Sequence, residues 1–127
     1  YATAVAAWCN ALKSCKPLRS DGNGEQTRDL VYVDDVADAN ITAALHDDDL
    51  KGRTFNICTG NVISNNEILQ VIWKAWGPYE RKDSPARPGD IEHSLGDPSS
   101  AKDILGFECT VPFAVGMDLT LGWWGLL

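Results

Sequence analysis

The sequence lacks the features that would place it in a membrane or on a nucleic acid. No apolar run approaches the roughly 20 residues that span a bilayer. The first residues, 1–4, carry no basic segment of a signal peptide, and no initiator Met is present. The 11 Lys and Arg residues form no cluster and are outnumbered by 18 Asp and Glu, for a net charge of −7. We therefore expect no membrane and no nucleic-acid partner.

Metal-binding and disulfide frameworks are missing as well. No two of the four cysteines have C-x-x-C spacing, and His46 and His93 each stand alone. A zinc site needs closely spaced ligand pairs, so no metal site is expected. An acidic chain without a signal peptide is not typical of a disulfide framework. We expect reduced thiols, mostly buried as small apolar groups, in a cytoplasmic protein. The four thiols are those of Cys9, Cys15, Cys58 and Cys109.

Common nucleotide-binding and nucleophile motifs are absent too. Gly22-x-Gly24 is not a dinucleotide fingerprint, because Thr27 stands where the third glycine belongs and a predicted strand follows instead of a helix. Neither a phosphate-binding P-loop nor a G-x-S-x-G nucleophile elbow occurs. Paired acidic residues such as Asp34 and Asp35 are interpreted as helix caps, and residues 47–49 as solvated charge.

What is present predicts alternating helices and strands. Apolar residues spaced by three or four predict four helices. A fifth, shorter helix is expected between Asp97-Pro98 and Gly106. The S-x-x-E pattern of Ser64 and Glu67 predicts a capping box for one of them. Short β-branched and aromatic runs predict strands. The helices cover 1–14, 36–45, 65–76, 98–105 and 112–124, the strands 29–33 and 54–58, and residues 77–90 form a loop.

This order of elements predicts an α/β fold with a small sheet and several helices. Two or three short strands are too few for a doubly wound nucleotide-binding fold. Residues 1–127 have the length of a single domain, which we expect to be part of a larger α/β assembly. The five tryptophans fall mostly on predicted helices, where packing explains them better than a stacking platform does. They are Trp8, Trp73, Trp76, Trp123 and Trp124.

Two loop arginines are candidates for anion binding. Arg28 follows a glycine-rich loop, and Arg87 lies in a turn of the longest loop. Guanidinium groups bind phosphate oxygens bidentately, so a diphosphate would account for both. The competing interpretation is a set of surface ion pairs of little energetic value. It pairs Arg28 with Asp29 or Glu25, and Arg87 with Glu92 or Asp90.

Four segments together resemble the NAD-dependent epimerase/dehydratase family, the extended short-chain dehydrogenases that act on nucleotide sugars. Residues 22–36, GNGEQTRDLVYVDDV, are similar to the family's G-[DN]-G-x-Q-x-R-D-[FL]-[VI]-[YH]-V-x-D-[VL] stretch. Residues 55–61 resemble its F-N-[IV]-G-x-G, 87–91 its R-x-G-D-[IV], and 97–107 its D-x-S-K-A-x-x-L-G-[FW]. The branch that epimerises UDP-glucose and UDP-N-acetylglucosamine at C4 is the most similar.

The resemblance implies a role for the chain and for three residues. The matching region is the C-terminal substrate domain, without the Rossmann half. By motif, Arg28 and Arg87 would bind the substrate's diphosphate, and Asp90 would lie by the ribose. The chain also departs from the pattern. Ser20-Asp21 stands where the family usually has Ile-Tyr or Ile-Phe, in a segment that runs beside the nucleotide base. Cys58 replaces a glycine of the family's pattern.

The family's redox residues have no counterpart here. Its Gly-rich NAD loop and its Tyr-x-x-x-Lys pair, in which the Tyr is the acid/base group, belong to the missing half. None of Tyr1, Tyr32 and Tyr79 is followed by Lys at that spacing. We therefore assign no catalytic and no cofactor-binding residue, with NAD implied only for the full-length enzyme.

The expected function is UDP-sugar binding as half of a 4-epimerase that is not catalytic alone. One alternative is the same half of a nucleotide-sugar 4,6-dehydratase. Another is a non-enzymatic binding or assembly module derived from the fold. The family packs this region on its dinucleotide domain, so an isolated chain is expected to expose apolar surface and to form homo-oligomers.

Overall fold

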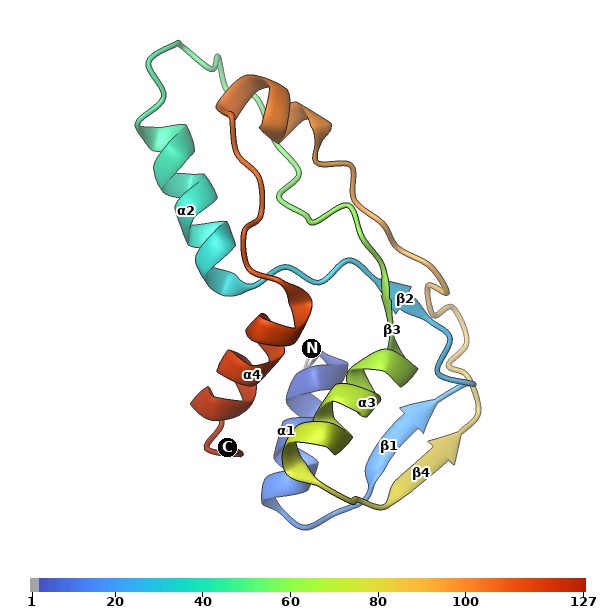
Figure 1. Ribbon diagram of the computed structural model, residues 1–127. Coiled ribbons are helices and arrows are strands. Elements are labelled where there is room, and N and C mark those ends of the chain that lie inside the picture. Colours follow the sequence, from blue (N-terminus) through green and yellow to red (C-terminus); the bar gives the residue numbers. More distant parts are fainter. Residues whose placement is uncertain (1–2) are drawn as a thin grey trace.

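The computed structural model describes residues 3–127. The molecule is elongated, with three helices gathered at one end and α2 (Val33–Ala44) at the other (Figure 1). A single π-helical turn, η1 (Ala101–Leu105), lies beside α2, and His46 Nε2 is 2.9 Å from the carbonyl oxygen of Ile104 there. Extended segments connect the two ends. The gathered helices are α1 (Ala4–Lys13), α3 (Asn65–Trp76) and α4 (Phe113–Trp123).

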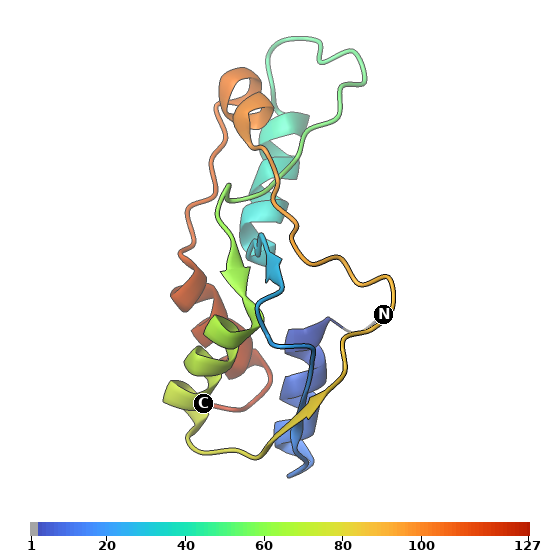
Figure 2. The same ribbon diagram turned by 90° about the vertical axis from the view of Figure 1, so that its right-hand side faces the viewer.

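The strands form two separate two-stranded sheets. β1 (Leu18–Asp21) runs parallel to β4 (Arg81–Ser84), so that Asp21 is paired with Ser84. β2 (Thr27–Arg28) is antiparallel to β3 (Ile63–Ser64) and lies between the two ends of the molecule (Figure 2). The predicted α/β class is confirmed, with the small sheet divided into one parallel and one antiparallel pair.

The apolar core fills the space between α1, α3, α4 and β1. Trp8 anchors it, because its side chain is 2% exposed and its indole N–H donates to the carbonyl oxygen of Arg19 at 2.7 Å. This hydrogen bond ties α1 to β1 in the interior. The other core residues are Cys9, Leu12, Leu18, Ile68, Leu69, Ile72, Met117, Leu121 and Leu126.

The helix predictions are confirmed apart from two caps. The short helix expected after Asp97-Pro98 is the π-helical turn η1, whose N-cap is Ser100. Ser64 and Glu67 form the expected capping box at the start of α3, and Gly106 ends η1 in the left-handed conformation at φ 65°. The predicted cap at Asp34 and Asp35 is wrong, because α2 begins after Tyr32. The Asp35 carboxylate is instead buried and accepts hydrogen bonds from Thr110 and Val111, far along the chain.

Both strand predictions are wrong, and a side chain joins the two regions where a backbone ladder was expected. Residues 29–32 and 54–58 form no strand, and Val33 already belongs to α2. The Asp29 carboxylate joins the two regions by accepting from the Thr59 amide at 2.9 Å, the Thr59 hydroxyl at 2.6 Å and the Gly60 amide at 2.9 Å. The actual strands β1 and β4 lie in and beside predicted turns and loops.

Tryptophans and cysteines depart in part from their predicted burial. Trp8 is buried, whereas Trp73, Trp76 and Trp123 are exposed, so the packing role predicted for these three is wrong. All four thiols are free, but only Cys9 is fully buried.

Within residues 3–127, no helix has the length and apolar character needed to cross a membrane. The same residues contain no cluster of His, Cys, Asp or Glu arranged to hold a metal ion.

Candidate functional site

The glycine-rich loop that carries Arg28 is docked on the start of α3. Asn66 donates its backbone N–H to the Gly24 carbonyl at 3.0 Å, and its side-chain amide donates to Asn23 O and to Glu25 Oε1. Gly24 is buried at φ 80°, and a Cβ there would collide with the Asn66 side chain. Only glycine fits this position, so the loop has one well-defined path into β2.

Arg28 and Asp90 meet although 62 residues separate them in the sequence. The Thr27 amide donates to the Glu92 carbonyl at 2.9 Å, which draws the two segments together. Arg28 Nη1 donates to the Thr27 carbonyl at 2.8 Å, and its Nη2 lies 3.4 Å from Asp90 Oδ1. Arg28 is therefore fixed mainly by backbone oxygen, with only a loose contact to the carboxylate.

Arg87 is held by a different carboxylate, that of Asp21 at the end of β1. Arg87 Nε lies 2.5 Å from Asp21 Oδ2, and Arg19 Nε lies 2.7 Å from Asp21 Oδ1. The Asp21 side chain is only 10% exposed, whereas that of Arg87 is 65% exposed. Hydrogen bonding from Arg19, and secondarily from Arg87, holds the pKa of Asp21 below its usual value, against the opposing effect of burial.

The sign of the resulting pH dependence follows from this lowered pKa. A carboxyl group with a depressed folded-state pKa stabilises the fold above its unfolded-state pKa. That stabilisation is lost as the pH falls through the folded-state pKa of Asp21. Both arginine side chains are exposed to solvent, so these ion pairs contribute little to the free energy of unfolding.

A pocket of about 300 Å³ brings together two of the three predicted site residues. Arg87 and Asp90 both line it, and Asp90 links it to Arg28. The buried Gln26 also lines it and donates its amide N–H to the Asp21 carbonyl at 2.7 Å. Within residues 3–127, Gln26 Oε1 is buried without a hydrogen-bond partner. The remaining lining residues are Gly22, Asn23, Ala86 and Glu92.

The charged residues that the sequence suggested as ion pairs have other partners in the structure. Asp29 is engaged by Thr59 and Gly60, and Glu25 accepts from Asn66, so neither pairs with Arg28. Arg87 pairs with neither Glu92 nor Asp90 within residues 3–127. Sequence reasoning missed the contact of Asp21 with Arg87. The only signal was that an acidic residue replaces the family's aromatic residue at this position.

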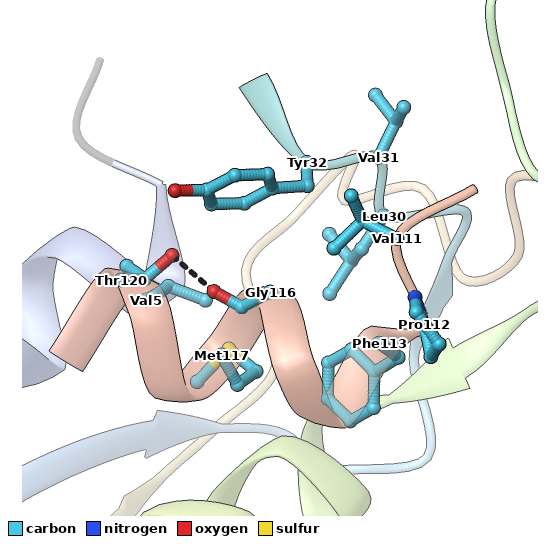
Figure 3. A pocket seen from close by; sticks show the side chains of 10 residues that line it. All are labelled: Val5, Leu30, Val31, Tyr32, Val111, Pro112, Phe113, Gly116, Met117 and Thr120. Atoms are coloured by element: carbon cyan, nitrogen blue, oxygen red, sulfur yellow. Dashed lines mark hydrogen bonds between the residues drawn. The ribbon is translucent and has the colours of Figure 1, made fainter. Parts of the chain in front are cut away.

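A second, apolar pocket of about 120 Å³ lies between α1, α4 and the segments that precede α2 and α4. Figure 3 shows the Tyr32 ring over Gly116 of α4. A Cβ on Gly116 would lie only 3.3 Å from the Tyr32 ring, so this close approach needs glycine. No charged side chain lines this pocket, and it contains none of the predicted site residues. Its lining is Val5, Leu30, Val31, Tyr32, Val111, Pro112, Phe113, Gly116, Met117 and Thr120.

The described residues do not fit NAD. Binding its pyrophosphate at a glycine-rich turn requires a strand, the turn and then a helix N-terminus. Here the loop of Gly22 and Gly24 runs from β1 into β2, and no helix follows it directly. The cationic groups near this loop are arginine side chains, which suit a phosphorylated ligand approaching from solvent.

The fold is that of part of an extended short-chain dehydrogenase. The family model described as "NAD dependent epimerase/dehydratase family" matches residues 1–58. The UDP-glucose 4-epimerase of Mycolicibacterium smegmatis is 36% identical over 118 residues, which cover 92% of this chain and 37% of that protein. The chain belongs to the NAD-dependent epimerase/dehydratase family.

Solved structures agree with this assignment. The UDP-glucose 4-epimerase of Thermotoga maritima, determined with UDP-glucose, superposes with a TM-score of 0.88 at 33% identity, over 98% of this chain and 40% of that one. The UDP-glucuronic acid 4-epimerase of Bacillus cereus, in complex with UDP-glucuronic acid and NAD, has a TM-score of 0.89 over 97% of this chain and 40% of that one. At 24% identity it supports the fold alone. The chain thus spans less than half the length of these relatives. A dTDP-glucose 4,6-dehydratase is among the relatives as well.

Proposed function

We propose that this chain is the UDP-sugar-binding part of an NAD-dependent sugar-nucleotide 4-epimerase. Residues 1–127 would form its C-terminal nucleotide-sugar-binding domain, while NAD and the acid/base residues would be held by a part outside this chain. In this proposal Arg28 and Arg87 bind the diphosphate and Asp90 lies by the ribose. The chain alone is not expected to catalyse the reaction.

The observation that carries the proposal is that Asp90 lies next to both of the arginines that the motifs single out. Asp90 contacts Arg28 and shares a pocket with Arg87. One guanidinium group lines the pocket and a second contacts the pocket residue Asp90, and two such groups suit an anion with oxygens on two phosphorus atoms. The relatives named above include an epimerase determined with UDP-glucose, which favours uridine diphosphate as the nucleotide.

Arg28→Ala and Arg87→Ala are each expected to weaken UDP binding by about 1–3 kcal/mol, because each removes charged hydrogen bonds to phosphate. Isothermal titration calorimetry of the chain with UDP measures the effect, starting from weak binding by the wild type. Arg53→Ala is the matched control, since Arg53 is exposed and lines a different pocket, near His46.

Equal UDP affinity for the wild type and both site variants would contradict the diphosphate assignment, as would a wild-type chain that does not bind UDP. The dehydratase alternative, supported by the dehydratase among the relatives, is tested separately. Product analysis of the full-length enzyme distinguishes it, because a dehydratase releases a keto-sugar and an epimerase does not.

We also propose that the isolated chain self-associates through α4. Val115, Leu119 and Trp123 are all exposed and recur every fourth residue, so they share one face of this helix. Sedimentation is expected to show an oligomer with an interface on the scale of the ~1,600 Å² typical of stable complexes. Trp123→Glu should shift it toward monomer, whereas Leu45→Glu at the exposed C-cap of α2 should not. A compact wild-type monomer at high concentration would count against self-association.

A further inference from the structure

The carboxylate of Asp21 is fixed in place by its own backbone. Asp21 closes β1 in register with Ser84 of β4, and its carbonyl accepts from the buried Gln26 amide. The next residue, Gly22, donates its N–H to the Ser84 carbonyl at 2.8 Å. Gly22 has φ 72°, and a Cβ there would collide with the Gln26 amide, so the turn that follows has little freedom. Arg87 is the exposed partner of this pair.

The two arginines assigned to the diphosphate are held in unequal ways. Arg28 is anchored by backbone carbonyls and reaches Asp90 at 3.4 Å, whereas Arg87 is bound to Asp21 at 2.5 Å through Nε. Within residues 3–127 this is the one hydrogen bond that the Arg87 side chain makes. An anion at Arg87 therefore meets a guanidinium whose charge is partly matched by a nearby, poorly hydrated carboxylate, which also pairs with Arg19.

We propose that Asp21 is a specificity-determining residue that limits diphosphate binding at Arg87. This inference rests on the proposed function. The carboxylate acts as an internal anion, which repels the incoming phosphate and competes with it for the same guanidinium. Arg19, on the other oxygen of Asp21, keeps this carboxylate in place when Arg87 turns toward a ligand. The site therefore favours ligands whose other contacts are strong enough to overcome the competition, and it binds bare phosphates weakly.

Asp21→Asn is expected to tighten binding of both UDP and inorganic pyrophosphate about fivefold to tenfold at low salt, and less at high salt, because it removes a like charge close to the ligand. Calorimetry at two ionic strengths measures this. The effect should disappear in the Arg87→Ala background, since it acts through that guanidinium.

Asp83→Asn is the matched control. Asp83 lies on the adjacent strand β4 and pairs with Arg81 Nε at 2.6 Å, so the variant removes the same charge and the same kind of ion pair. In the β1–β4 register Asp83 is paired with Ser20, and it therefore projects from the face of the sheet opposite to Asp21. The pyrophosphate affinity of the Asp83→Asn variant should stay within about twofold of wild type, because the sheet separates residue 83 from the ligand.

The outcomes separate this inference from the proposed function. If Arg87→Ala weakens UDP binding while Asp21→Asn leaves it unchanged or weaker, the Asp21 inference is overturned and the diphosphate site stands. If neither Arg28→Ala nor Arg87→Ala has an effect, the diphosphate site fails, and the inference fails with it. If Asp21→Asn does not fold, a nuclear magnetic resonance titration of the wild-type chain tests the inference instead. Titration with pyrophosphate should shift the Arg87 Nε–Hε resonance at saturation, and an unchanged resonance overturns the diphosphate assignment of Arg87 and the inference with it.

Discussion

Replacing Asp35 with alanine is expected to lower the free energy of unfolding by about 3–5 kcal/mol. The carboxyl group is 1% exposed and accepts from the Thr110 amide at 2.9 Å, the Thr110 hydroxyl at 3.1 Å and the Val111 amide at 3.2 Å. Truncation leaves these donors without an acceptor in a place that water reaches poorly, which is costlier than losing an exposed hydrogen bond. Urea denaturation followed by far-UV circular dichroism measures the change.

Asp34→Ala is the natural control for this experiment. Asp34 is the adjacent residue in the first turn of α2 and is exposed. Its loss removes only a favourable interaction with the helix dipole, worth about 0.3–1 kcal/mol. Asp35→Asn should lie between the two, because the amide keeps an acceptor oxygen while its NH₂ group faces a donor. Equal losses for the Asp34 and Asp35 alanine variants would show that the Asp35 contacts contribute little.

The same contacts matter for the shape of the molecule. The segment that Asp35 holds leads directly into α4 through Pro112, the N-cap of that helix. Val111 and Pro112 also line the apolar pocket against Tyr32 (Figure 3). Asp35 thus connects the end of the molecule that contains α2 to the helix that completes the main core. In an elongated chain with few core contacts at the α2 end, this connection is one of few that resist local opening.

Helices were predictable from the sequence because their signals are local. The apolar spacing of α3 and its capping box depend only on residues 64–76, and both are found as expected. The strands were not, because each depends on a partner far along the chain. β4, with the sequence Arg-Lys-Asp-Ser, has no apolar residue and forms only because it pairs with β1. Conversely, the apolar run at residues 30–33 forms no strand and enters α2 at Val33.

The candidate site, too, could be predicted only in part from the sequence. Arg28, Arg87 and Asp90 were available from motifs, since each lies in a short segment with a characteristic neighbour sequence. Their ion-pair partners were not, because the contact between Asp21 and Arg87 exists only through the register of β1 with β4. Likewise the buried, unpartnered oxygen of Gln26 follows from the packing of a loop, which no spacing in the sequence encodes.

Trp8→Ala is expected to cost about 3–5 kcal/mol of unfolding free energy, the usual range for truncating a large buried aromatic residue. Trp8→Phe keeps most of the apolar volume and loses the hydrogen bond to the Arg19 carbonyl, for about 1–2 kcal/mol. Trp123→Ala, at a side chain 81% exposed, serves as the control and should change stability by less than about 1 kcal/mol. Urea denaturation with circular dichroism detection compares the three without relying on tryptophan fluorescence. A Trp8→Ala variant as stable as Trp123→Ala would contradict a core centred on α1 and β1, and with it the rigid placement of Asp21 at the end of that strand.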